Sequence, residues 1–280
     1  MGLPRDIIEE ILRFLQKDVR TLKACSLTCR ALFSAARRLI HRRVRLATWK
    51  PCKLVDRVVA RVLRGRRVHE AYMGHLSMAG KRGLLGYVRE VYIDIGQGFT
   101  PDILEFYLPH FRSLTQVQTL TISHFDLPKF LPTFERYFAQ FVPTLRSLHL
   151  PQVICNAHEI LEFICKFPHL DDLSLTLRLS NYVDVPSGLS VERSPPLKGT
   201  LVLKGLVSAP VRFLLEIPGG LHFRSIDAGG VDKAELDEIL AACSSTLEVF
   251  SLCPRSREFT QYAIRRPSQL KYSQCWTPRT

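Results

Sequence analysis

Cysteine, histidine and carboxylate side chains are the groups in this sequence that could do chemistry, and a metal site is the first possibility. Cys25 and Cys29 lie four positions apart, so both thiols would share one face of a helix, and His41 follows nearby. A structural zinc site needs four ligands, however, and both cysteines also fit an apolar helical pattern. We therefore expect neither a metal site nor a bound cofactor.

Clustered carboxylates are the second possibility, because a pair of them can supply a general acid and a general base. The candidates are Asp171 with Asp172, and the group Asp232, Glu235, Asp237 and Glu238. The second group flanks the apolar positions Leu236 and Ile239, which indicates the exposed face of a helix. The histidines near expected turns and strands are His110, His124, His149 and His169. None has an assignable nucleophile or base, so we predict no catalytic residue and no enzymatic activity.

Length and composition indicate a folded chain with room for a small module and one larger domain. Of its 280 residues 46% are hydrophobic, yet no apolar run approaches a membrane span and no secretory signal opens the sequence. Eight cysteines occur without CxxC pairs, which is typical of reduced thiols. We expect a cytoplasmic or nuclear protein, or one found in both, without a membrane partner.

The positive charge is concentrated at the front of the chain. Residues 1–87 contain 20 Lys and Arg against 6 Asp and Glu, whereas the remainder contains 19 against 20. Runs such as Arg37-Arg38 and Arg42-Arg43 could neutralise phosphates or serve in nuclear import. No zinc finger or RNA-binding aromatic motif accompanies them, so an acidic protein partner or a solvated helix face is favoured over nucleic acid.

The first forty residues predict short amphipathic helices. Ile7, Ile8, Ile11, Leu12 and Leu15 form one helical stripe, after Pro4 in a position suited to the first turn. Asp18 is a capping candidate for further helices with apolar positions at Leu22, Cys25, Leu27, Leu32, Phe33, Ala36 and Ile40. So short a segment is too small for an ordinary independent core, so we expect another protein to cover its apolar face.

The same segment resembles an F-box over about residues 3–42. The resemblance lies in Leu3-Pro4 leading into Ile7-Ile8, in Leu15 and Asp18, and in Ser26-Leu27-Thr28-Cys29-Arg30. Many family members carry Trp soon after that Arg, where this chain has Leu32 and Phe33. The resemblance implies binding of a Skp-type adaptor and, through it, a cullin scaffold. The implied adaptor-binding residues are Leu3, Pro4, Ile7, Ile8, Ile11, Leu12, Leu15, Leu22, Cys25, Leu27, Arg30, Leu32 and Phe33.

From residue 88 onward one pattern recurs: apolar, two variable, apolar, one variable, apolar. The copies are Val88-Val91-Ile93, Val117-Leu120-Ile122, Leu145-Leu148-Leu150, Leu170-Leu173-Leu175, Lys198-Leu201-Leu203, Phe223-Ile226-Ala228 and Leu247-Phe250-Leu252. They start 24 to 29 residues apart, and helical patterns lie between them at 102–108, 134–141, 158–164, 211–217, 234–242 and 259–264. This period is typical of leucine-rich repeats. It predicts strand-helix units that stack into an irregular solenoid with a curved parallel sheet.

The predicted organisation is therefore an α/β protein in three parts. Residues 1–42 form the helical F-box, 43–87 a linker and capping unit, and 88–280 the repeat domain. In the capping unit we expect a strand at 44–46, a helix over 54–63 and a loop over 74–86. The stretch 181–196 is rich in Pro and Gly, and it is either a binding loop or a surface insertion.

The variable positions within the repeat strands are candidates for target binding. When the flanking apolar residues point inward, the residue between them lines the concave face of the sheet. These positions are Tyr92, Thr121, His149, Ser174, Val202, Asp227 and Ser251. Their mostly small, polar side chains suit recognition of a protein or peptide, although they could also be plain solvated strand residues.

By resemblance, the chain is similar to the large fungal families of F-box proteins with leucine-rich-repeat-like domains. The resemblance implies the substrate-recognition subunit of an SCF-type ubiquitin ligase, which holds an adaptor at one end and an unknown target protein at the other. Two alternatives remain open. One is a scaffold that binds the adaptor without ubiquitylation of a target, and the other is a nucleic-acid-binding protein that uses the basic front.

Overall fold

The computed structural model of the chain describes residues 4–16, 18–47, 84–95, 111–179, 196–204, 211–252 and 271–272. The protein is α/β and divides into two compact units. The first contains the described residues up to Asp94 together with 111–118, and the second contains Ile95 and the described residues from Thr119 onward. Leu3, the helices expected over 54–63, 102–108 and 259–264, and nearly all of the 181–196 stretch lie outside the described residues.

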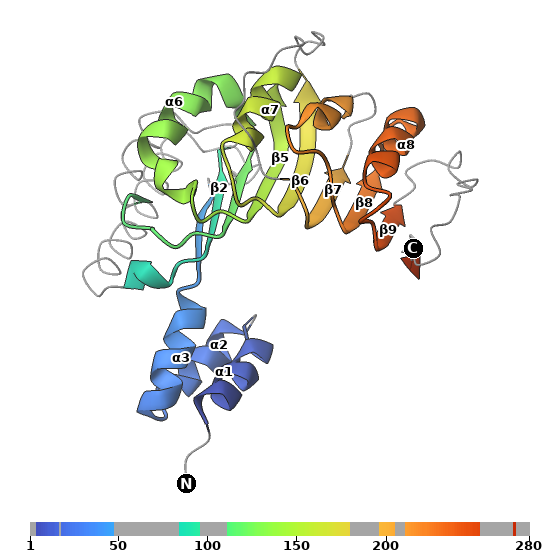
Figure 1. Cartoon of the computed structure of the whole chain (residues 1–280). Helices are drawn as coiled ribbons and strands as arrows, with labels where there is room; N and C mark the ends of the chain where they lie inside the picture. Colours follow the sequence, from blue (N-terminus) through green and yellow to red (C-terminus); the bar gives the residue numbers. More distant parts are fainter. Residues whose placement is uncertain are drawn as a thin grey trace, which may run out of the picture. The chain divides into compact units, whose positions relative to one another are not determined.

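Three helices open the first unit (Figure 1). They are α1 at Arg5–Phe14, α2 at Val19–Cys25 and α3 at Arg30–Ile40. The predicted cap of α2 is confirmed: Asp18 accepts hydrogen bonds from the Thr21 amide at 3.0 Å and from the Thr21 hydroxyl at 2.6 Å. The hydroxyl bond is the largest cause that lowers the pKa of the Asp18 carboxyl. We call α1 to α3 the three-helix module.

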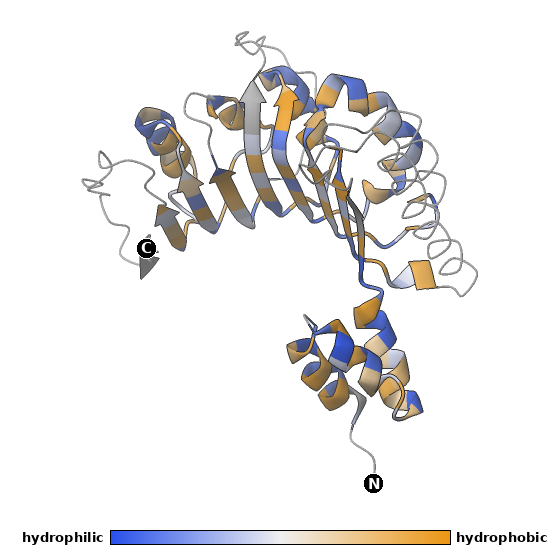
Figure 2. Ribbon diagram, turned by 180° about the vertical axis from the view of Figure 1, so that it is seen from behind, coloured by the Kyte–Doolittle hydropathy of each residue, from blue (hydrophilic) through white to orange (hydrophobic). Residues whose placement is uncertain are grey.

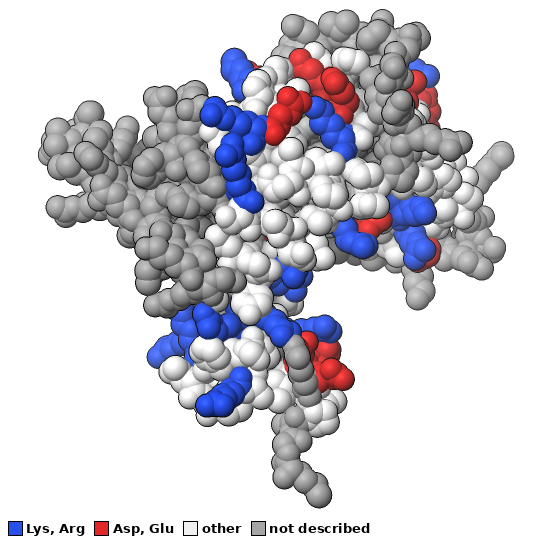
Figure 3. Space-filling view, turned by 60° about the vertical axis from the view of Figure 1, so that its left-hand side comes forward, with Lys and Arg blue, Asp and Glu red and all other residues white. Residues whose placement is uncertain are grey.

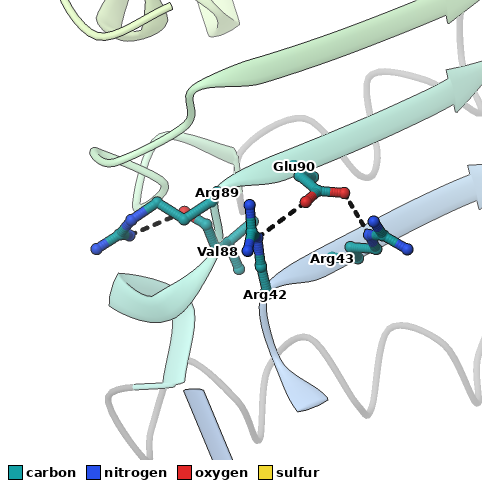
Figure 4. Close-up of polar contacts among 5 residues, drawn as sticks. All are labelled: Arg42, Arg43, Val88, Arg89 and Glu90. Atoms are coloured by element: carbon teal, nitrogen blue, oxygen red, sulfur yellow. Dashed lines mark hydrogen bonds and ion pairs between the residues drawn. The ribbon is translucent and has the colours of Figure 1, made fainter. Parts of the chain in front are cut away.

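A pair of parallel strands completes the first unit. β1 at Arg43–Ala47 pairs with β2 at Glu90–Asp94, which confirms the strand expected at 44–46. Figure 4 shows the Glu90 carboxylate between two guanidinium groups: Arg42 Nε lies 2.9 Å from one oxygen, and Arg43 donates to the other. The prediction of a loop over 74–86 is wrong at its end, because Leu84–Tyr87 form a 3-10 helix, η1.

The second unit is built on a parallel sheet in which consecutive strands are neighbours. Its strands are β3 at Thr119–Ser123, β5 at Ser147–Cys155, β6 at Asp172–Leu179, β7 at Thr200–Lys204, β8 at Ser225–Gly229, β9 at Val249–Leu252 and β10 at Lys271–Tyr272. The short strand β4 at Phe125–Asp126 also pairs with β5. Of these strands β3 and β5 to β9 follow the repeat pattern seen in the sequence, whereas β4 and β10 lie outside the seven copies.

Helices cover one side of this curved sheet, as Figures 1 and 2 show. They are α6 at Leu127–Tyr137, α7 at Ala157–Cys165 and α8 at Lys233–Ala242, with the 3-10 helices η2 at Ala139–Phe141 and η3 at Arg212–Glu216. Asn156 and Glu159 form a capping box that begins α7. This alternation of strand and helix is compatible with a solenoid-like α/β fold.

The core lies between the sheet and the helices, and the repeated apolar residues fill it. Leu148 is buried and sits in register between Leu120 and Leu173 on the adjacent strands. Aromatic rings close the layer between α6 and α7, where the ring centroids of Phe134 and Phe163 are 4.9 Å apart. Packing of this kind gives strands such as β3, β7 and β8 an apolar side and a half-exposed side, and Figure 2 shows this as alternating colours along the strands.

Several local expectations need correction. The helix predicted over 134–141 is instead α6, which starts at Leu127 because Pro128 suits a first turn, and it gives way to the 3-10 helix η2. The helix predicted over 211–217 is also a 3-10 helix. In the fifth repeat Leu197 is buried whereas Lys198 is exposed, so the apolar side chain one position earlier enters the core.

Two matched irregularities were not foreseen, one between β3 and β4 and one within β5. His124 and Gln152 both adopt the left-handed backbone conformation, with φ of 58° and 60°. The His124 amide donates to the Pro151 carbonyl at 3.1 Å, and the register between β5 and β6 shifts between Pro151 and Val153. His124 and Gln152 thus each interrupt the regular strand pairing by one residue. The pairing resumes where β4 lies alongside the second half of β5.

We predict that Gly199→Ala destabilises the second unit. A Cβ at this position would lie 2.5 Å from Asp172 Oδ1 and 2.7 Å from the Asp171 carbonyl oxygen, so the backbone or the carboxylate must shift. The expected cost is about 1–3 kcal/mol in the free energy of unfolding, measured by urea denaturation. Gly86→Ala is the control, because no atom lies within 4 Å of its added Cβ, and a Gly199 variant as stable as this control would contradict the prediction.

Candidate functional site

The three-helix module has a small core of its own. Leu12 and Leu22 are only 1% and 0% exposed, and Ala35 and Ala36 are buried with them. Around this centre pack the half-buried side chains of Ile8, Leu15, Cys25, Leu32, Leu39 and Ile40. The expectation that only another protein could cover the apolar face is therefore wrong for half of that face, because the three helices cover it for one another.

The other half of the apolar stripe is exposed. On α1, Ile7 and Ile11 are each 49% exposed and Phe14 is 82% exposed, and their spacing places them on one side of the helix. Leu27, in the turn before α3, is 86% exposed, and Phe33 on α3 is 43% exposed. Exposed large apolar groups at this density on a small module are typical of a docking surface.

The predicted adaptor-binding residues thus fall into two groups. Those at the surface are Pro4, Ile7, Ile11, Leu27, Arg30 and Phe33, whereas Ile8, Leu12, Leu15, Leu22, Cys25 and Leu32 belong to the module's core or pack against it. Leu3 lies outside the described residues. Two exposed apolar residues, Phe14 and Val19, were missed. Phe14 could have been found from its spacing, since it follows Ile7 by seven positions and Ile11 by three.

Ion pairs connect the helices of the module without hiding these apolar groups. Arg38 Nη1 on α3 lies 3.0 Å from Glu9 Oε1 on α1, and Arg13 lies 2.9 Å from Glu10 within α1. Both pairs are partly exposed, so each contributes at most about 1 kcal/mol. The stability of the module therefore depends mainly on its apolar core.

The second candidate surface is the open face of the parallel sheet, on the side away from the helices. The six predicted target-binding positions of the second unit lie in one row across the sheet. Each residue of the row pairs in register with the next one on the neighbouring strand. The row runs Thr121, His149, Ser174, Val202, Asp227, Ser251. All six are half-exposed. We call this row the strand ladder. Tyr92 belongs to the first unit, where it pairs in register with Arg45.

A second polar row runs beside the strand ladder and is internally hydrogen-bonded. Asp172 accepts from the Ser147 hydroxyl and from the Thr200 amide, each at 2.8 Å, so this carboxylate joins β5, β6 and β7. Apart from the His149 imidazole, the described side chains of both rows are short and contain no ring. The surface can therefore admit a partner close to the sheet and offer it hydroxyl, imidazole and carboxylate groups.

The carboxylates considered for catalysis have structural partners. Asp232 caps α8 by accepting from the Ala234 amide at 2.8 Å, and Glu235 accepts from the Val211 amide at 2.8 Å. Glu238 pairs with Arg212 at 3.1 Å and Asp171 with Arg146 at 3.5 Å. Most of the carboxylates in the two sets therefore have a structural role, as helix caps, hydrogen-bond acceptors or members of surface ion pairs.

The cysteine and histidine candidates are also dispersed. Cys25 packs against the module's core while Cys29 is exposed at the start of α3, and burial is the main cause that lowers the pKa of His41. Burial raises the pKa of the Cys155 thiol to about 12, which leaves it protonated and unreactive at neutral pH. Within the described ranges, no three His, Cys, Asp or Glu residues are grouped so as to hold a metal ion.

No family model matches the sequence, and a search of the curated proteins found no match. The described helices include none with the length and apolar character needed to cross a membrane. The class of protein that the structure defines is an α/β fold with a parallel sheet of strand-helix units, preceded in the chain by a three-helix module.

We predict that Leu22→Ala destabilises the three-helix module and that Leu27→Ala hardly affects its stability. Leu22 is fully buried, so its truncation should cost about 2–5 kcal/mol through lost burial and the cavity left behind. Leu27 is exposed, so the same change should alter the free energy of unfolding by no more than about 0.5 kcal/mol. Thermal unfolding, monitored by circular dichroism, measures the stability of both variants. Equal losses of stability would contradict the division between core and surface.

Proposed function

We propose that this protein is the substrate-recognition subunit of an SCF-type ubiquitin ligase. In this proposal the three-helix module is an F-box that binds a Skp-type adaptor, and the parallel sheet is an irregular leucine-rich-repeat domain that binds a target protein. The chain itself makes and breaks no bond. It acts by holding the target beside a ubiquitin-loaded enzyme, which raises the effective concentration of the reacting groups.

The observation that carries the proposal is the split apolar stripe on α1. Ile8, Leu12 and Leu15 hold the module together, whereas Ile7, Ile11 and Phe14 remain at the surface. A helix whose only task is to cover a core has no need of three large apolar residues on its outer side. Their exposure therefore supports a partner that buries them, and the resemblance of residues 3–42 to an F-box suggests which partner.

The strand ladder supports the second half of the proposal. Six half-exposed side chains from six parallel strands lie in one row, with a second polar row beside it. Such an array presents many weak polar contacts over an extended surface, which suits the recognition of another protein. We infer that the target lies along this open face of the sheet.

We predict that Ile11→Asp prevents adaptor binding while the chain stays folded. The residue is exposed, so the substitution should leave the module's core intact, but in the complex it would bury an unpaired charge. Affinity for a purified Skp-type adaptor should fall at least about a hundredfold, or about 3 kcal/mol, in isothermal titration.

The matched control is Ile154→Asp. This isoleucine is 40% exposed and lies on β5 in the second unit, so the same change there should leave adaptor affinity unchanged. Adaptor binding by a folded Ile11→Asp variant at the affinity of the unaltered chain would contradict the proposal. A complex that forms but supports no ubiquitylation of any target in a complete ligase would favour the non-ligase scaffold.

We also predict which side of the sheet touches the target. A photo-reactive amino acid at Ser174, in the strand ladder, should crosslink to the protein that the reconstituted ligase ubiquitylates. The same group at Glu162, exposed on α7 and therefore on the helical side, should not. Crosslinks from position 162 without crosslinks from position 174 would place the target on the helical side. That result would exclude the strand ladder as the target-binding site.

A further inference from the structure

The second half of the three-helix module and the strand after it contain basic residues but no acidic ones. Between Val19 and Ala47 the sequence contains eight Lys and Arg residues and no Asp or Glu. Carboxylates from elsewhere in the first unit neutralise three of them: Glu9 pairs with Arg38, and Glu90 pairs with Arg42 and Arg43 (Figure 4). Among the described residues no carboxylate pairs with Arg20, Lys23, Arg30 or Arg37.

Arg30 and Arg37 lie on either side of one aromatic residue along α3, and Lys23 lies within electrostatic range of the residue that follows this helix. Arg30, Phe33 and Arg37 follow one another at helical spacing on α3, and the Arg37 guanidinium carbon sits 4.8 Å from the centre of the Phe33 ring. Lys23, near the end of α2, belongs to the same neighbourhood. Its charge acts together with that of Arg37 on His41, where both cations add to burial in lowering the pKa of the imidazole. We call Lys23, Arg30, Phe33 and Arg37 the basic stripe.

The acidic residues of the module lie elsewhere. Asp6, Glu9 and Glu10 are all on α1, and Asp18 is occupied in capping α2. In Figure 3 the red side chains of the three-helix module form one group, and blue side chains lie both directly beside this group and over the rest of the visible face. The module is therefore electrically polar, and a partner that covers its basic side must bring negative charge to it.

We propose that the basic stripe binds an acidic segment of the adaptor, and this inference rests on the function proposed above. The segment supplies carboxylates to Lys23, Arg30 and Arg37, and it supplies apolar side chains to Phe33 and Leu27. The adaptor-docking surface then has two parts of different chemistry. The apolar residues of α1 provide affinity, and the basic stripe speeds association and excludes partners without the matching charge.

A nucleic acid matches this surface less well than an acidic protein segment. Phosphates could pair with the cations, but they offer nothing apolar to Leu27, which is 86% exposed. A base could stack on an aromatic ring, yet the Arg37 guanidinium already covers one side of Phe33. A protein chain that carries both carboxylates and apolar side chains therefore matches these cations and exposed apolar groups better than a nucleic acid does.

The test uses the full chain and a purified Skp-type adaptor, and it measures association and dissociation rates at salt concentrations from low to high. The variant is Lys23→Glu with Arg37→Glu, and the milder variant Arg37→Gln guards against loss of folding. At low salt the double variant should associate about tenfold more slowly than the unaltered chain, and the difference should shrink as salt rises. Circular dichroism verifies that each variant is folded.

The control is Arg136→Glu with Lys198→Glu, which makes the same change in net charge on exposed residues of the second unit. It should associate at close to the rate of the unaltered chain. Equal slowing in the control would show that net charge alone is responsible and would overturn the inference. Adaptor association that is independent of salt and unaffected by Lys23→Glu with Arg37→Glu would overturn it too, while leaving the proposed function intact.

Two further outcomes distinguish failure of this inference from failure of the proposed function, and an acidic protein segment from a nucleic acid. If the unaltered, folded chain does not bind the adaptor at any salt concentration, the proposed function itself fails. A parallel titration with a 20-nucleotide single-stranded RNA tests the rival partner. RNA binding that is lost in the double variant, with adaptor association unchanged, would assign the basic stripe to nucleic acid and overturn the inference.

Discussion

Burial of the repeated apolar residues across neighbouring strands is the constraint on which the second unit depends. A strand such as β7, with Leu201 and Leu203 on one side, cannot bury both residues alone; it does so because β6 and β8 flank it in register and helices cover that side. The same alternation leaves the residues between the buried ones half-exposed in β3, β7 and β8 and in the first half of β5. The core and the candidate target-binding surface are therefore two consequences of one periodicity.

Most of the sheet could be predicted because this periodicity is local. The positions of β2, β3 and β5 to β9 follow from apolar residues spaced by three and two, and the strand ladder follows from the residue between them. What the sequence could not show depends on neighbours. His124 and Gln152 take left-handed conformations that no local signal demands, and they are matched across adjacent strands. Likewise, only the packing of the three helices decides that Leu12 is core and Ile11 is surface.

The two candidate surfaces differ in chemistry, and the difference fits the proposed division of labour. The three-helix module exposes large apolar groups beside cations that no carboxylate of the described residues neutralises, which favours a tight complex with one partner of matching shape and charge. The open face of the sheet exposes short polar side chains, with Asp172 already engaged by Ser147 and Thr200. Such a surface favours a weaker complex with a partner that changes from one cycle to the next, as a substrate receptor requires.

Hydrogen-deuterium exchange with and without a Skp-type adaptor can separate the two candidate surfaces, because it reports on every part of the chain in one experiment. We expect the adaptor to slow exchange in peptides from the three-helix module, over residues 4–40, and to leave the sheet peptides from 119–252 unchanged. Slower exchange in the sheet with no change in the helices, or no change anywhere at saturating adaptor, would contradict this expectation.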